Sequence, residues 1–193
     1  MTVWIIESYR RRIREVRFLL MLTALVIASS ICSADEILIG CWFGPSISKQ
    51  NLQDLAKANF NFTVLDPGEG DSNLSTKEAI ERAAVARIQD GLRICQRVGI
   101  KALVNDERFK TSYFGEPAYW KGIDDMLSDY SAYPALLGYS ITDEPNAIQF
   151  EWIGQVKEYL LKKNSKHIAF VNIFPNTALK WLLGTSSYGD KLC

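Results

Sequence analysis

The sequence predicts an α/β fold in which helices cover a parallel sheet. Short apolar runs alternate along the chain with longer stretches whose apolar residues recur at helical spacing. The 193 residues are 48% hydrophobic and 23% charged, with 22 basic and 22 acidic side chains, an ordinary globular composition. No nucleic acid partner is expected, because phosphate binding needs a basic surplus.

Residues 1–34 form a segment with its own composition. Five arginines precede an apolar stretch at residues 18–31, and small residues stand just before Asp35. This layout predicts a signal-peptide helix, cleaved after Ala34, and a secreted or periplasmic protein. The stretch is short for a bilayer span of about 20 residues, so no stable membrane span is expected after cleavage. An uncleaved N-terminal anchor is the alternative.

Residues 35–193 are predicted to form one mildly acidic domain. Because the leader holds five arginines and two glutamates, 17 basic and 20 acidic side chains remain, a net charge of −3. The three remaining cysteines, Cys41, Cys95 and Cys193, are too widely spaced for a disulfide framework or a zinc site. There is no glycine-rich phosphate loop either. The sequence therefore predicts no cofactor and no metal.

Five apolar runs of strand length are predicted at residues 37–43, 60–65, 101–104, 136–142 and 168–173. Turn residues end the first three runs, at Gly44-Pro45, Asp66-Pro67-Gly68 and Asn105-Asp106. Four helices are predicted between the strands, at residues 48–59, 76–98, 116–130 and 147–163. Ser48 is a good N-cap for the first helix, and Gly99 is a good stop for the second. Strands that alternate with helices of this length indicate right-handed crossovers and a parallel sheet.

The spacing of the strands leaves two architectures open. The strands begin at a mean step of roughly 32 residues, and eight such units need about 260 residues, the usual size of a (β/α)8 barrel. One reading is a complete five-stranded open sheet of the flavodoxin kind. The other is the N-terminal part of a TIM barrel, about five β/α units.

Residue types on the fourth strand favour the barrel. Counting back in twos from Glu144 gives Thr142, Ser140 and Gly138 on one face, against Ile141, Tyr139 and Leu137 on the other. A strand lining a barrel has such unlike faces, whereas a central strand of a doubly wound sheet is apolar on both. The sequence therefore predicts five strands in sequential order, with helices on the convex side only.

Polar residues follow the predicted strands. Trp42 follows the first, Asp66 the second, Asn105 and Asp106 the third, and Asp143 and Glu144 the fourth, while Asn172 and Asn176 lie around the fifth. In a barrel the carboxyl ends of all strands meet at one mouth, where active sites are built. We therefore expect these side chains to form one site.

The segment from Leu137 to Asn146, with Asp143-Glu144-Pro145 at its centre, resembles the fourth-strand motif of clan A glycoside hydrolases. Trp42-Phe43-Gly44-Pro45 and the Tyr133-Pro134-Ala135 lead into the fourth strand support the resemblance, which covers residues 37–188. The Asp-Glu-Pro form is similar to a subset of exported, β-galactosidase-like or cellulase-like bacterial barrels. Asp143 stands where that family usually has Asn.

The resemblance implies a glycosidase-like domain with Glu144 as the acid/base. Such enzymes act on O-glycosidic bonds, so the implied partner is an oligo- or polysaccharide. Trp42 is a candidate platform for a sugar ring, and Asn105, Asp106, Asp143 and Asn172 are candidates for binding sugar hydroxyls. Simpler interpretations stay open: Trp42 as a core aromatic residue, and Asp143 and Glu144 as solvated residues that precede a helix.

In the family that the chain resembles, the nucleophile lies at the end of the seventh strand. Five strands are predicted here, so we expect a truncated domain with an acid/base but without a nucleophile. Whether the chain acts as an enzyme is left open. The alternatives are a non-catalytic carbohydrate-binding remnant and an exported open-sheet α/β protein of unrelated function.

Overall fold

The computed structural model describes residues 37–68, 74–110, 112, 114–163, 166–175 and 177–184. The predicted signal segment, Asn176 and Cys193 lie outside these residues. The chain divides into two units, Met1–Ile37 and Leu38–Cys193, and every element below belongs to the second. No helix among the described residues is both long and apolar enough to cross a membrane.

The sheet has five parallel strands in the order β1-β2-β3-β4-β5. They are β1 (Gly40–Cys41), β2 (Phe62–Leu65), β3 (Lys101–Asn105), β4 (Leu136–Asp143) and β5 (Ile168–Asn172). A doubly wound sheet reverses its strand order at a switch point. The sequential order therefore confirms the barrel-type prediction and rules out the flavodoxin-like open sheet.

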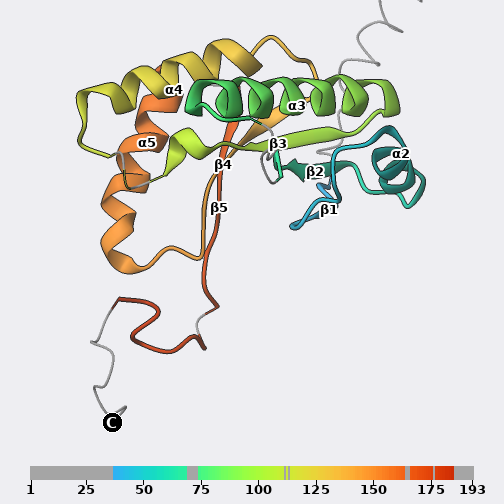
Figure 1. The fold of residues 1–193 in the computed structure, drawn as a ribbon. Helices are drawn as coiled ribbons and strands as arrows, with labels where there is room; N and C mark the ends of the chain where they lie inside the picture. Colours follow the sequence, from blue (N-terminus) through green and yellow to red (C-terminus); the bar gives the residue numbers. More distant parts are fainter. Residues whose placement is uncertain are drawn as a thin grey trace, which may run out of the picture. The chain divides into compact units, whose positions relative to one another are not determined.

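Four helices connect the strands (Figure 1): α2 (Lys49–Lys57), α3 (Lys77–Val98), α4 (Pro117–Tyr130) and α5 (Phe150–Lys163). Local sequence sets their ends. The side chains of Ser48 and Thr76 cap α2 and α3 by accepting backbone N–H bonds, and Gly99 ends α3 at a φ of 82°. The predicted helix at 147–163 begins instead with a short 3₁₀ turn, η3 (Ala147–Gln149), which Asn146 caps.

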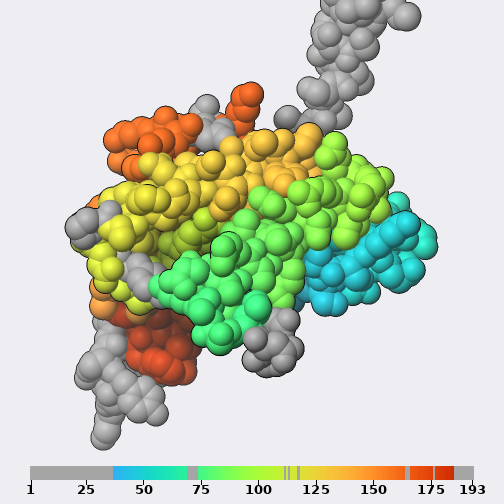
Figure 2. All heavy atoms as spheres, turned by 45° about the horizontal axis from the view of Figure 1, so that its top comes forward, coloured from blue at the N-terminus to red at the C-terminus, as the bar shows by residue number. Residues whose placement is uncertain are grey.

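One hydrophobic core joins the sheet to all four helices. Side chains of the four helices and of the sheet form a single buried cluster, which includes Leu52, Leu92, Ile123 and Val156 from the helices and Val104, Tyr139 and Ile141 from the strands. In Figure 2 the outer surfaces of α3 (green) and α4 (yellow) lie side by side. Because one cluster contains all four helices, they cover the same face of the sheet, as the sequence predicts.

The first strand is shorter and more exposed than predicted. We expected a buried strand at residues 37–43, but only Gly40 and Cys41 pair with β2. Ile37 and Phe43 are 79% and 82% exposed. The physical reason is that β1 is an edge strand, so nothing among the described residues pairs with its outer side and its flanking side chains are left uncovered.

The opposite face of the sheet is concave. Val64, Leu103 and Gly138 are register partners on neighbouring strands, and the next layer pairs Asn105 with Ser140 and Ser140 with Phe170. A Cβ atom on Gly138 would lie 2.0 Å from the carbonyl oxygen of Ile168, so only glycine allows β5 to approach here. Trp42, just after β1, contacts Phe170 of β5 with ring centroids 5.2 Å apart. Since β1 and β5 are opposite edges of the sheet, this contact requires the sheet to curl like part of a barrel.

Candidate active site at the carboxyl end of the sheet

The carboxyl ends of the five parallel strands point the same way and define a mouth. Of the predicted site residues, Trp42 follows β1, Asn105 ends β3, Asp143 ends β4, Glu144 follows it, and Asn172 ends β5. Asn105 and Phe170 are both register partners of Ser140, so their side chains share the concave face. The structure thus gathers most of the predicted set at one end of the sheet.

The end of β4 contains a register shift. Ser140 pairs with Phe170, but Asn172, two residues further along β5, pairs with Asp143, three residues further along β4. Side chains alternate between the faces of a strand, and an extra residue reverses that alternation beyond it. The shift therefore brings Asp143 to the face that Asn172 shares with Phe170. Counting back in twos from Glu144, as in the sequence analysis, had placed Thr142 and Glu144 on that face instead.

Glu144 stands in an unusual backbone conformation just after this shift. Its φ is 44°, in the left-handed region that non-glycine residues rarely adopt. Its backbone N–H donates to the carbonyl oxygen of Asn172 at 2.8 Å. The side chain is exposed.

Hydrogen bonds and ion pairs occupy the other acidic side chains that follow strands in the described chain. Asn105 Nδ2 donates to Asp66 Oδ2 at 2.8 Å, and Asn172 Nδ2 donates to Asp143 Oδ1 at 2.7 Å. Asp106 pairs with Arg108, and Glu107 with Lys110. The side chain of Glu144, by contrast, has no hydrogen bond or ion pair with any residue that the structure describes.

The concave side of the mouth also carries an aromatic surface. Trp42 is half-buried and lies against Phe170 and Phe43. The sequence analysis singled out Trp42 but missed Phe170, which looks like an ordinary apolar strand residue. The available signal was its spacing of two from Asn172, which places both side chains on one face of β5.

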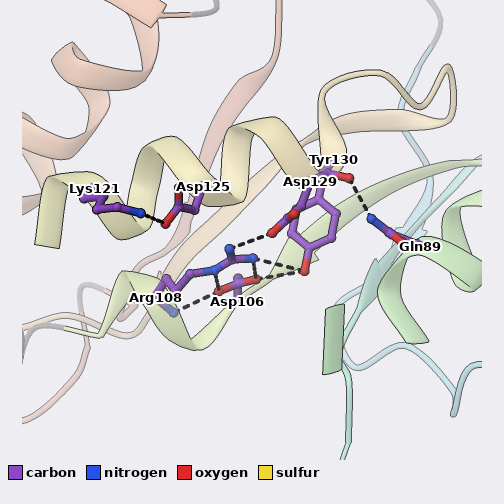
Figure 3. A network of polar contacts seen from close by, with 7 residues as sticks. All are labelled: Gln89, Asp106, Arg108, Lys121, Asp125, Asp129 and Tyr130. Atoms are coloured by element: carbon purple, nitrogen blue, oxygen red, sulfur yellow. Dashed lines mark hydrogen bonds and ion pairs between the residues drawn. The ribbon is translucent and has the colours of Figure 1, made fainter. Parts of the chain in front are cut away.

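Asp106 is turned to the other side of the sheet. Asn105 and Asp106 are successive residues, and successive side chains in extended chain point to opposite faces, so Asp106 lies on the helix side. Arg108 donates to it through Nε at 2.8 Å and Nη2 at 2.7 Å, and Tyr130 Oη donates to it at 2.9 Å (Figure 3). A contact of Asp106 with carbohydrate stays a prediction, but both of its carboxylate oxygens already have partners.

This network extends to Asp129, which accepts from Arg108 Nη1 at 2.7 Å. Burial opposes ionisation of Asp106, but the hydrogen bonds and charge of Arg108 outweigh it and hold the pKa of that carboxyl below its ordinary value. Burial, with Asp106 nearby, raises the pKa of Tyr130. Asp106 and Arg108 thus link the end of β3 to Asp129 and Tyr130 of α4 through a charged, hydrogen-bonded cluster, which is a structural arrangement.

A cavity of about 360 Å³ borders the same network between α3 and α4. Ile80, Val85 and Tyr119 line it together with Asp106 and Arg108. Neither Glu144 nor any residue of β4 or β5 is among its lining residues. The cavity is therefore not part of the site around Glu144.

The described residues contain no group of three or more His, Cys, Asp or Glu side chains that could hold a metal ion. The residues at the mouth offer carboxylate and amide oxygens, amide N–H donors and aromatic rings. Such a set can hydrogen-bond hydroxyl groups and pack against the apolar face of a ring.

The curled sequential sheet, helices on its convex side and polar strand ends define the class of this structure as the first part of a (β/α)8 barrel. A family 5 glycoside hydrolase, the mannosidase of Rhizomucor miehei, has the same architecture, with a TM-score of 0.52 at 9% identity over 75% of this chain and 52% of that chain. A mutant of that enzyme in complex with mannosyl-fructose gives 0.52 at 10% identity over the same shares.

An endoglucanase of Pseudomonas stutzeri is also similar, at a TM-score of 0.47 and 15% identity over 65% of this chain and 43% of that chain. The sequence matches no family model and no curated protein. The chain spans about half of the length of the mannosidase. At these identities the similarity is one of fold alone.

Proposed function

We propose that this chain carries the acid/base part of a glycoside hydrolase-type site that acts on O-glycosidic bonds of an oligo- or polysaccharide. The observation that carries the proposal is Glu144, an exposed carboxylate at the carboxyl end of β4 without a partner among the described residues. The neighbouring strand-end carboxylates Asp66, Asp106 and Asp143 are all engaged.

The chemistry of glycoside hydrolysis gives such a carboxyl group a role. A carboxylic acid protonates the leaving oxygen, and a second carboxylate acts as a nucleophile about 5–5.5 Å away in retaining enzymes. A group that transfers a proton to substrate must reach it, and it cannot do so while locked in an ion pair. Glu144 is exposed and has no ion pair with a described residue, so it meets this requirement. Its place directly after β4 agrees with the acid/base role that the resemblance implies.

Carbohydrate binding at the mouth is proposed for Trp42, Asn105, Asp143 and Asn172. Sugar rings present C–H groups on one face and hydroxyls at the edge, so they need an aromatic surface beside amide and carboxylate groups. Trp42 and Phe170 supply the aromatic surface. The two amide–carboxylate pairs, Asn105–Asp66 and Asn172–Asp143, supply donors and acceptors.

A second candidate function is carbohydrate binding without hydrolysis. It is favoured by the hydrogen bonds that engage Asp66, Asp106 and Asp143, which leave no second unpartnered carboxylate among the described strand-end residues. Export also remains part of the proposal: the basic and apolar leader before Asp35 supports a secreted or periplasmic location.

Calorimetric titration of the 193-residue chain with manno- and cello-oligosaccharides tests the proposal. Saturable binding is expected, and Trp42→Ala should weaken it about tenfold, or about 1.4 kcal/mol, because apolar ring area is lost. Tyr133→Ala is the matched control, since Tyr133 precedes β4 at the other end of the sheet. No binding, or equal binding by the wild type and Trp42→Ala, contradicts the proposed site.

A further inference from the structure

We propose that Asn172 is a positioning residue that holds the Asp143–Glu144 turn in place at the mouth. The importance of this role rests on the proposed function, because that function gives Glu144 its chemistry. The contacts that carry the inference involve no ligand.

Asn172 holds two successive residues of the turn at once. Its side-chain Nδ2 donates to Asp143 Oδ1 at 2.7 Å, and its backbone carbonyl accepts the N–H of Glu144 at 2.8 Å. These bonds come directly after the register shift of β4. The ladder between β4 and β5 therefore ends on Asn172.

Glu144 needs such support because its backbone is strained. A non-glycine residue at a φ of 44° costs of the order of 1 kcal/mol, and it persists where the surroundings determine the conformation. On the downstream side, Pro145 is buried, and Asn146 and Gln149 form a capping box. On the upstream side, Asn172 makes the contacts that fix the turn, so the backbone of Glu144 is held at both ends while its carboxylate has no partner in the part of the chain that the structure describes.

The chemistry of this pair requires an amide at position 172. Asp143 is a carboxylate and accepts hydrogen bonds, so its partner must donate. A carboxylate in place of Asn172 would set two negative charges at hydrogen-bond distance and push the strand ends apart. Exchanging the side chains of Asp143 and Asn172 with each other restores one donor and one acceptor.

Hydrogen exchange of the Glu144 backbone amide in the 193-residue chain, measured by ¹H–¹⁵N spectroscopy, tests this role. Asn172→Asp should speed that exchange about tenfold. The double variant Asp143→Asn with Asn172→Asp should return it to near the wild-type rate. Asn172→Ala, which removes the donor without adding a charge, should speed exchange by a smaller factor of about three, so the test stands even if Asn172→Asp does not fold.

The Asn105–Asp66 pair supplies a matched control. It has the same chemistry at the neighbouring strand ends, with a donor–acceptor distance of 2.8 Å, but its hydrogen bond joins Asn105 to Asp66 and not to the Asp143–Glu144 turn. Asn105→Asp should leave the Glu144 exchange rate unchanged. Unchanged exchange in both Asn172 variants, equal acceleration by Asn105→Asp, or failure of the double variant to restore the rate would each overturn the inference.

This outcome is independent of the outcome of the carbohydrate titration. If the exchange data agree and no sugar binds, the positioning role stands and the proposed function is wrong. If sugar binds and the exchange data disagree, the proposed function stands and Asn172 is not what holds the turn.

Discussion

Replacing Arg108 with alanine is expected to lower the free energy of unfolding by about 3 kcal/mol. Arg108 bonds Asp106, whose side chain is 9% exposed, and also Asp129. Without the guanidinium, the Asp106 carboxylate is left nearly buried and without its cation, beside Tyr130 and close to Asp129, which is 33% exposed. Removing one partner of a buried ion pair is far more costly than removing an exposed one. Urea unfolding followed by circular dichroism measures the change.

Lys121→Ala is the control for this prediction. Lys121 pairs with Asp125 on α4 at 2.6 Å (Figure 3), but its side chain is 76% exposed, so its loss should cost less than about 0.5 kcal/mol. A loss below about 1 kcal/mol for Arg108→Ala would show that the network is not important for stability.

The Asp106–Arg108 ion pair also predicts that the free energy of unfolding depends on pH. Since the pKa of Asp106 is lower in the folded protein than in the unfolded chain, the stabilisation is fully present above an unfolded carboxyl pKa of about 3.9. It is lost as the pH falls through the lower, folded-state pKa. The stability difference between wild type and Arg108→Ala should therefore shrink in acid.

Replacing Glu144 with glutamine is expected to reduce glycoside turnover by about 10²- to 10⁴-fold, the usual contribution of general acid catalysis. The expectation applies to a longer chain in which further strands complete the barrel and a second carboxylate is present. Glutamine keeps the shape of the side chain but carries no acidic proton. Initial rates with unactivated oligosaccharides measure the effect.

Aryl glycosides with very acidic leaving groups are the matched control substrates. Their leaving oxygen needs little protonation, so Glu144→Gln should slow their glycosylation step much less. For the 193-residue chain itself we expect negligible turnover. Hydrolysis needs two available carboxyl groups, and Glu144 is the one strand-end carboxylate without a partner among the described residues. Robust hydrolysis by that chain would mean that another carboxylate serves as the second group.

The architecture could be predicted because it depends on local patterns. Apolar runs separated by capped helices at regular spacing determine a parallel sheet, and the small residues Gly138 and Ser140 indicate a concave face. The observed order of the strands follows. The exposed first strand was not predicted, because whether an apolar run is buried depends on what pairs with its outer edge.

The details of the site depend on contacts between distant residues, which spacing alone does not show. The register shift near Thr142 is set by pairing with β5 and moves Asp143 to the face of Asn172. The partners of Asp106 include Tyr130, 24 residues away. The sequence therefore predicted which residues lie near the strand ends, but not which of their side chains are free.

Carbohydrate is proposed to bind at the mouth beside Glu144, and ¹H–¹⁵N spectra of the 193-residue chain titrated with manno- or cello-oligosaccharide test this binding residue by residue. We predict saturable shifts for the signals of Trp42, Asn105, Asp143, Glu144 and Asn172, with little change along α3 and α4. Shifts confined to the residues around Arg108 and Tyr119, or no shifts at all at high sugar concentration, would show that carbohydrate does not bind at the mouth.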